Sequence, residues 1–232
     1  MKSRPVYLLA GGRHGRRRQP DPLLQGFFRE CGQSPSVAYV GAASGDDRSF
    51  FDFIAAAFKA AGAGRVDHAI TAPDGADIVK AKTILEHADI VFISGGDVEA
   101  GMDVLRANSV IDFLSGLFRA GKPFLGLSAG SIMLGREWVR WPNPENEDYA
   151  ELFPCLGFAP VICDTHDEDG GWEELQAALA LEKDGARGYG IATGTGLKVF
   201  PGGRVEALGG PVFEYVSRGG KAERIGDILP LK

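Results

Sequence analysis

The sequence predicts a doubly wound α/β protein, in which helices cover both faces of a mostly parallel sheet and β-hairpins follow near the C-terminus. Short apolar runs rich in β-branched residues recur in the first part of the chain, as buried parallel strands require. Segments of helical periodicity separate these runs, and the alternation favours right-handed strand–helix–strand units. In the last third, shorter runs follow one another with turn residues between them, which is typical of hairpins.

Five parallel strands are expected in the first part of the chain, over residues 6–9, 37–40, 66–70, 90–94 and 123–127. Helices are expected between them, over residues 50–61, 78–87, 102–107 and 110–120. The first of these helices has a broad apolar face and ends at Gly62, a residue type that commonly closes helices. The last two segments form one helix that breaks near Asn108.

The sequence of the last third of the chain predicts one helix and several short strands. The helix is expected over residues 172–181, and the strands over 161–164, 190–191, 197–200, 205–207 and 212–215. Pro201, Gly202 and Gly203 supply the turn of one hairpin. We expect the hairpins to extend or cap the same sheet. Since no repeat or linker interrupts the chain, residues 1–232 are expected to form a single domain.

Composition and charge argue against several classes of protein. The 232 residues carry a net charge of −6, the wrong sign for holding a polyanion, so no nucleic-acid partner is expected. The basic run at residues 13–18 is expected to be a solvated loop, with an anion site as the alternative. No apolar stretch approaches the roughly 20 residues of a membrane helix, so no membrane partner is expected.

The three cysteines, Cys31, Cys155 and Cys163, are widely spaced and odd in number. Such a set suggests neither a disulfide framework nor a zinc site, and it fits a reducing, cytoplasmic location. The glycines after the first strand lack the rest of any phosphate-binding pattern, and no metal-ligand spacing occurs. Neither a cofactor nor a metal is therefore expected.

The segment Gly126-Leu127-Ser128-Ala129-Gly130 lies where the fifth strand is expected to end and a short helix over residues 131–134 to begin. A strand that runs into a tight turn with small residues on both sides of a serine is what a nucleophile elbow requires. The hydroxyl would then stand at the carboxyl end of the sheet, where open α/β sheets bind ligands. The alternative is a serine that caps the short helix.

A second glycine turn, Ser94-Gly95-Gly96-Asp97, ends the preceding strand. If the two strands are neighbours, the backbone amides of this turn lie beside Ser128 and can form an oxyanion hole with the amide of Ala129. The alternative is a turn that only lets the chain enter the next helix at Glu99.

Of the four histidines, His166 is the one expected to pair with Ser128. It follows the strand predicted at residues 161–164, and it lies on the same edge of the sheet if that strand is parallel to the others. Its Nε2 would take the serine proton and return it to the leaving amine. His68, inside a predicted strand, and His87, near a helix end, are expected to be structural or surface residues.

These motifs, in this order at the ends of alternating strands, resemble the dipeptidase E and cyanophycinase family of serine peptidases. The resemblance rests on Gly95-Gly96-Asp97, Gly126-Leu127-Ser128-Ala129-Gly130 and Asp164-Thr165-His166, and the closing strands up to Leu208-Gly209-Gly210 extend it over nearly the whole chain. It implies a flavodoxin-like fold similar to that of class I glutamine amidotransferases. It also implies Ser128 as nucleophile, His166 as base, Gly96 and Ala129 as oxyanion donors, and a monomer or homodimer.

One departure from the family pattern concerns the third catalytic residue. The family has a glutamate that orients the histidine after its glycine-isoleucine strand, whereas Thr193 occupies that place here. Threonine can accept a hydrogen bond from an imidazole, but it adds no charge to stabilise imidazolium. Asp164, Asp167, Glu168 and Asp169 are the candidates to replace that acid.

The segment after the histidine departs as well. Where the family has an aromatic residue and arginines that hold an acidic side chain, this chain has Asp167-Glu168-Asp169. Carboxylates repel such a side chain, so a neutral or cationic substrate is expected, with Asp97 and Asp167 as candidate substrate-binding residues. The alternative is that these three carboxylates simply face water.

Two functions are compatible with these residues. The first is a serine hydrolase that cleaves a small peptide or amide through an acyl-enzyme on Ser128 and is not specific for aspartyl substrates. The second is a family member with little or no turnover that binds a small peptide-like ligand in the same cleft. Thr193 favours the second, and the intact serine, histidine and glycine turns favour the first.

Overall fold

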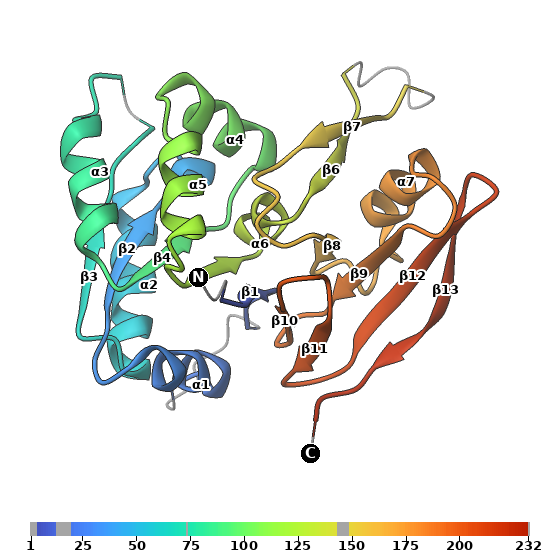
Figure 1. The fold of residues 1–232 in the computed structure, drawn as a ribbon, viewed down its shortest axis with the longest axis horizontal. Coiled ribbons are helices and arrows are strands. Elements are labelled where there is room, and N and C mark those ends of the chain that lie inside the picture. Colours follow the sequence, from blue (N-terminus) through green and yellow to red (C-terminus); the bar gives the residue numbers. More distant parts are fainter. Residues whose placement is uncertain (1–3, 13–19, 73, 143–148, 232) are drawn as a thin grey trace.

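The computed structural model describes residues 4–12, 20–72, 74–142 and 149–231, and it confirms the predicted fold class. The main sheet has seven strands in the order β11-β10-β1-β5-β4-β2-β3. Figure 1 shows this sheet and its helices on the left and centre of the view, and a second sheet on the right. The basic run at residues 13–18 lies outside the described residues.

Five neighbouring strands of the main sheet are parallel, as the sequence predicts. They are β1 (Val6–Leu9), β5 (Phe124–Leu127), β4 (Ile90–Ile93), β2 (Ser36–Val40) and β3 (Arg65–His68). The strands β10 (Gly196–Val199) and β11 (Val205–Leu208) form an antiparallel hairpin, and β10 pairs with β1. The predicted hairpin turn between these two strands is therefore confirmed.

Helices cover both faces of this sheet, because successive strand residues point to opposite sides. On one face, Leu8 and other strand residues share a core cluster with α3 (Ile78–His87), α4 (Val98–Ala107) and α5 (Ile111–Arg119). On the other face, Tyr7 and Leu9 share a cluster with α1 (Pro22–Cys31) and α2 (Arg48–Ala61). The predicted break near Asn108 lies between α4 and α5.

A second sheet corrects the expectation that all the hairpins belong to one sheet. Its order is β13-β12-β9-β8, formed by β13 (Lys221–Ile228), β12 (Val212–Arg218), β9 (Arg187–Ile191) and β8 (Ile162–Thr165). The helix α7 (Glu173–Leu181) packs on it closely, since a Cβ at Gly188 would lie 2.7 Å from Leu175 Cδ1 and one at Gly190 would lie 2.6 Å from Trp172 Cδ2. On the α7 side, Ile162 of β8 and Tyr215 of β12 share a separate core cluster with that helix, whereas Cys163, Tyr189 and Val212 belong to the core cluster of the main sheet.

Several further elements were not predicted. They are α1, the short 3₁₀ helix η1 (Ala42–Ser44), the hairpin of β6 (Glu137–Arg140) and β7 (Glu151–Pro154), and β13. The start of α1 does have a sequence signal, because Asp21 accepts a hydrogen bond from the amide of Leu23 and Pro22 occupies the first turn. The β6–β7 hairpin packs on α7, where the indole of Trp138 donates to Glu174.

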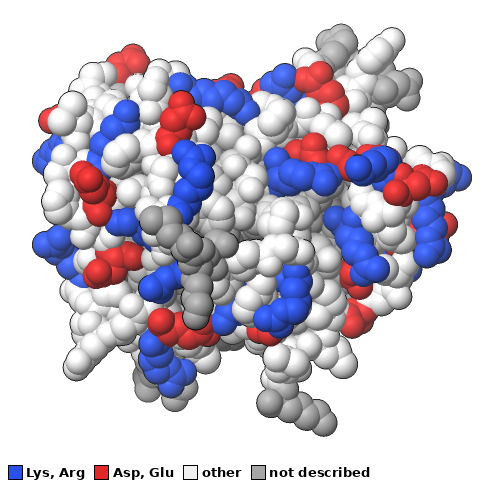
Figure 2. All heavy atoms as spheres, viewed as in Figure 1, with Lys and Arg blue, Asp and Glu red and all other residues white. Residues whose placement is uncertain are grey.

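Charged side chains of both signs are interspersed over the face seen in Figure 2. Several of them pair, as Arg140 does with Glu99 and Glu151. In the portions of the chain that the structure describes, no helix combines the length and apolarity needed to cross a membrane.

Candidate active site

Ser128 lies in a strained turn between β5 and the short helix α6 (Ala129–Leu134). Its backbone has φ 55° and ψ −127°, a conformation that residues with a side chain rarely adopt. The turn packs tightly on the neighbouring strand, because a Cβ at Gly130 would lie 2.1 Å from the carbonyl oxygen of Ile93. The Ser128 side chain makes no capping hydrogen bond to α6, so the alternative of a helix-capping serine is wrong.

The second glycine turn lies directly beside this serine, because β4 and β5 are neighbouring strands. A Cβ at Gly95 would lie 3.1 Å from Ser128 Cβ and 3.6 Å from Ser128 Oγ. Gly96 has φ 143° and approaches η1 so closely that a Cβ there would lie 2.0 Å from Ala43 O. Within the described residues, the amides of Gly96 and Ala129 donate to no protein acceptor. Both amides are therefore available to a ligand.

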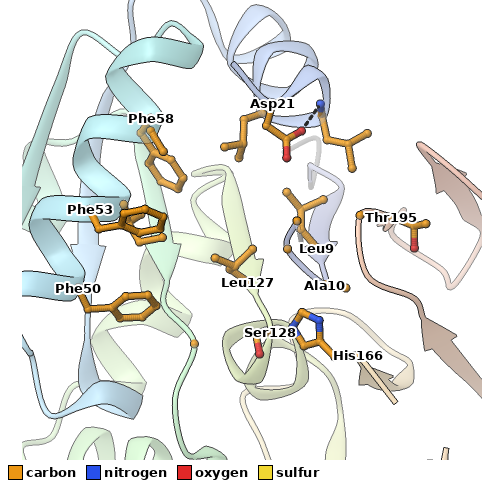
Figure 3. A pocket seen from close by; sticks show the side chains of 18 of the residues that line it. Leu9, Ala10, Asp21, Phe50, Phe53, Phe58, Leu127, Ser128, His166 and Thr195 are labelled. Carbon is orange, nitrogen blue, oxygen red and sulfur yellow. Dashed lines mark hydrogen bonds between the residues drawn. The ribbon is translucent and has the colours of Figure 1, made fainter. Parts of the chain in front are cut away.

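His166 reaches Ser128 from the second sheet, not from the main one, since it follows β8. Its φ is 64°, and its amide donates to Ile191 O at 3.2 Å. The ring lies near Gly11, where a Cβ would be 3.6 Å from His166 Cε1. Ser128 and His166 line one cavity, in which Figure 3 shows the imidazole turned toward the serine. The other two described histidines are elsewhere: the His68 side chain is 6% exposed and pairs with Asp46, and His87 is exposed.

Thr193 lies at the other side of the imidazole. His166 Nδ1 and Thr193 Oγ1 are 3.4 Å apart, and the amide of Thr193 donates to both carboxylate oxygens of Glu168, at 3.2 and 3.3 Å. Partial burial would raise the pKa of Glu168, but hydrogen bonds from Thr193 and the charge of His166 outweigh it and hold the pKa below its usual range. Four carboxyl groups were predicted as candidates to replace the family acid. Of these, Glu168 is the one that accepts hydrogen bonds from Thr193.

The two candidate substrate-binding aspartates cap helices. Asp97 Oδ1 accepts a hydrogen bond from the amide of Ala100 at 2.8 Å, at the start of α4. Asp167 Oδ2 accepts one from the amide of Glu173 at 2.9 Å, at the start of α7. Neither aspartate is among the residues that line the cavity.

Asp164 is a buried carboxyl group behind the site. It is 4% exposed, its Oδ1 accepts a hydrogen bond from the amide of Thr165, and its Oδ2 has no partner in the described part of the chain. Burial raises the pKa of Asp164 to about 7. Its negative charge therefore disfavours the folded state once it ionises.

The Asp164→Asn variant is expected to remove part of the pH dependence of stability. In the unfolded chain an aspartate has a pKa of about 3.9, so between about pH 4 and pH 7 the folded state binds more protons. Stability from this group is present at low pH and is lost as the pH rises through about 7. Calorimetric melting from pH 5 to pH 8 should show a smaller fall in Tm for Asp164→Asn than for the unchanged protein. An equal fall in both would contradict the assignment.

A large apolar cavity opens beside the serine and histidine. Its volume is about 820 Å³, and Phe50, Phe53 and Phe58 of α2 line one wall of it, as Figure 3 shows. Leu9 and Leu127, from the ends of β1 and β5, also line it. This cavity was not predicted from the sequence, although the broad apolar face of α2 that lines it was.

Comparisons with known proteins bear on the family and the fold. A family model described as peptidase family S51 matches residues 6–206. A peptidase from an acI-B1 Actinobacterium has a similar structure, with a TM-score of 0.69 at 17% sequence identity, covering 98% of this chain and 97% of that one. A protein of Listeria monocytogenes EGD-e assigned as a peptidase E has a TM-score of 0.61 at 14% identity, covering 88% and 97% of the two chains. No curated protein matches the sequence.

Proposed function

Since the chain belongs to peptidase family S51, we propose that it is a serine hydrolase that cleaves a small peptide or amide through an acyl-enzyme on Ser128. The observation that carries the proposal is the strained Ser128, whose side chain does not cap α6 and lies with His166 in one cavity. A strained conformation costs about 1–3 kcal/mol and persists where the surrounding structure enforces it, most often at functional sites. The three cysteines are free thiols, which suits a cytoplasmic enzyme.

The reaction begins with attack of Ser128 Oγ on the carbonyl carbon of the scissile amide. The hydroxyl proton passes to His166 Nε2, and the amides of Gly96 and Ala129 donate to the oxygen that becomes negative. The C–N bond then breaks, His166 gives its proton to the leaving amine, and an ester on Ser128 remains. A water molecule next attacks this ester with His166 as base, which releases the acid and restores the serine.

Thr193 and Glu168 hold the histidine for these steps. The threonine hydroxyl accepts a hydrogen bond from His166 Nδ1–H, and the threonine in turn is held by the carboxylate of Glu168. The distance of 3.4 Å between His166 Nδ1 and Thr193 Oγ1 is long, as such contacts often are before a substrate is bound. Glu168 thus supplies through one intervening residue the negative charge that the family glutamate supplies directly.

Covalent labelling tests this function. We expect an alkyl fluorophosphonate to add once to the protein, with the adduct on Ser128, and intact-mass measurement should show none on Ser128→Ala. His166→Ala should label at least 100-fold more slowly, because general-base assistance contributes about 10²–10⁴ to the rate. Circular dichroism shows whether both variants are folded. A folded wild-type protein that takes no label would favour the second hypothesis, a cleft that binds a peptide-like ligand without turnover.

A further inference from the structure

We infer that Tyr39 is a positioning residue, whose buried side chain holds the glycine turn at Gly95 and Gly96 where its amide can donate to the oxyanion. The inference rests on the proposed hydrolase function, because this turn lies beside Ser128. Tyr39 is fully buried in β2 and supports the turn from the core. An oxyanion donor is effective when it is already in place as charge develops on the substrate. Residues that fix the donor therefore contribute to the rate.

The hydroxyl of Tyr39 reaches the turn through Ser94. The strand β2 pairs with β4, which leads into the turn (Figure 1). Tyr39 Oη and Ser94 Oγ are 2.8 Å apart, and both side chains are fully buried. The single hydroxyl proton of Ser94 goes to Gly95 O, at 3.2 Å, so Tyr39 donates to Ser94 Oγ. Burial raises the pKa of Tyr39, so the phenol keeps the proton that this hydrogen bond needs.

The ring of Tyr39 also supports the element that packs on Gly96. A Cβ at Gly41, directly before η1, would lie 2.8 Å from Tyr39 Cε1. Within η1, Ala43 O accepts from the amide of Asp97 at 2.8 Å, and it would lie 2.0 Å from a Cβ at Gly96. Tyr39 therefore supports the turn in two ways, through its hydroxyl and through its ring.

Aromatic neighbours fix the ring of Tyr39. It packs edge-on against Phe51 and His68, with 5.1 Å between ring centroids in each pair, and it lies 5.4 Å from Phe92. Because side chains in a close-packed interior hold one another in place, the hydroxyl is fixed as well. A phenylalanine would fill the same space. Tyr39→Phe therefore removes the hydroxyl and keeps the packing.

Tyr39→Phe tests the inference through the kinetics of fluorophosphonate labelling of Ser128. We expect the maximal labelling rate to fall about 10-fold, because full loss of an oxyanion donor costs about 10²–10³ and a loosened donor should lose less. The reagent concentration that gives half of this rate should stay the same. The pH midpoint of labelling, which reports the ionisation of the base, should not move. A variant that only lowered Tm would leave the maximal rate unchanged at temperatures well below Tm.

Tyr7→Phe is the matched control. Tyr7 is buried in β1 of the same sheet, and its hydroxyl donates to Glu30 near the end of α1. Neither of these two residues lines the cavity, so this variant should label at the wild-type rate. It loses a tyrosine hydroxyl and its hydrogen bond, as Tyr39→Phe does, but leaves the support of the glycine turn intact.

Ser94→Ala tests the connection from its other end. It removes the hydroxyl that bonds to Tyr39 and to Gly95 O, so it should slow labelling by a similar factor. Since Tyr39 and Ser94 act through one hydrogen bond, the double variant should be about as slow as the slower single variant. Losses that add in the double variant would show that the two side chains act separately, which would contradict the inference.

Hydrogen exchange at the Asp97 amide, followed by NMR, measures the turn without any reaction. This amide bonds to Ala43 O, and its exchange should be faster in Tyr39→Phe than in Tyr7→Phe. Equal labelling and equal exchange in the two variants would overturn the inference and leave the hydrolase. Faster exchange in a protein that takes no label would sustain the support of the turn and remove the hydrolase.

Discussion

Asp46→Asn is expected to lower the free energy of unfolding by about 3 kcal/mol, because a buried, hydrogen-bonded charge loses its partners. The Asp46 side chain is fully buried. Its Oδ1 meets His68 Nε2 at 2.9 Å and the amide of Gly41 at 3.0 Å, and its Oδ2 accepts from the amides of Thr71 and Ala72. An asparagine can accept through only one of its two side-chain ends, so at least one buried donor is left without a partner. For a chain of this length, Tm should fall by roughly 6–12 °C.

The pKa of Asp46 predicts how its contribution to the stability of the folded protein changes with pH. Burial alone would raise it, but hydrogen bonds from His68, Thr71 and Ala72 outweigh burial and hold the pKa below its usual range. A depressed carboxyl pKa contributes stability above the unfolded value of about 3.9, and the contribution is lost as the pH falls through the folded value. The difference in Tm between the unchanged protein and Asp46→Asn should therefore shrink in strong acid.

The neighbouring Asp47→Asn serves as the control. Asp47 is exposed and caps α2 through the amide of Phe50, and asparagine caps helices as well as aspartate does. A Tm for Asp46→Asn within about 2 °C of that for Asp47→Asn would contradict the assignment, because a loss of about 3 kcal/mol should lower Tm by roughly 6–12 °C.

Asp46 also matters to the site through η1. The amide of Asp46 donates to Gly41 O, and the amide of Gly41 donates to Asp46 Oδ1. Ala43 lies in the turn between these two residues. Ala43 O accepts from the amide of Asp97 at 2.8 Å and lies against Gly96. Loosening this turn should therefore slow fluorophosphonate labelling of Asp46→Asn even at temperatures well below its Tm.

The sequence was sufficient for features that depend on local pattern. Ser128 follows a strand with small residues on both sides, and alternation of apolar runs with helical segments favours parallel strands. The structure supplies the adjacency of β4 and β5 that places Gly95 beside Ser128. The second sheet could not be predicted in this way. The apolar run of β8 indicates a buried strand but not its neighbour, which depends on the packing of α7 against Gly188 and Gly190.

The cavity and the acid behind the histidine depend on tertiary structure as well. Phe50 and Phe53 line a cavity whereas Phe51 packs in the core, yet the three are alike in the sequence until the orientation of α2 is known. Which carboxylate reaches Thr193 depends on how the loop turns after His166, whose φ of 64° no sequence pattern indicates.

Glu168→Gln is expected to slow acylation of Ser128 by about 100-fold. Loss of the directly bonded acid in well-studied triads costs roughly 10⁴ in turnover, and a charge that acts through one intervening residue should contribute less. Glutamine keeps an acceptor oxygen for the amide of Thr193, so the loop can fold as before while the charge is lost. The second-order rate constant for labelling by a fluorophosphonate, measured below the Tm of each protein, gives the effect.

Two further variants separate charge from local structure. Asp169→Asn removes a nearby exposed carboxylate and should label at the wild-type rate. Thr193→Val keeps the backbone amide that donates to Glu168 but removes the hydroxyl beside His166 Nδ1, so it should slow labelling by a similar factor. Since both residues act on the histidine through one connection, the double variant should be little slower than either single one. If Glu168→Gln labels as fast as Asp169→Asn, the charge of Glu168 does not assist His166, and the imidazole functions with threonine alone.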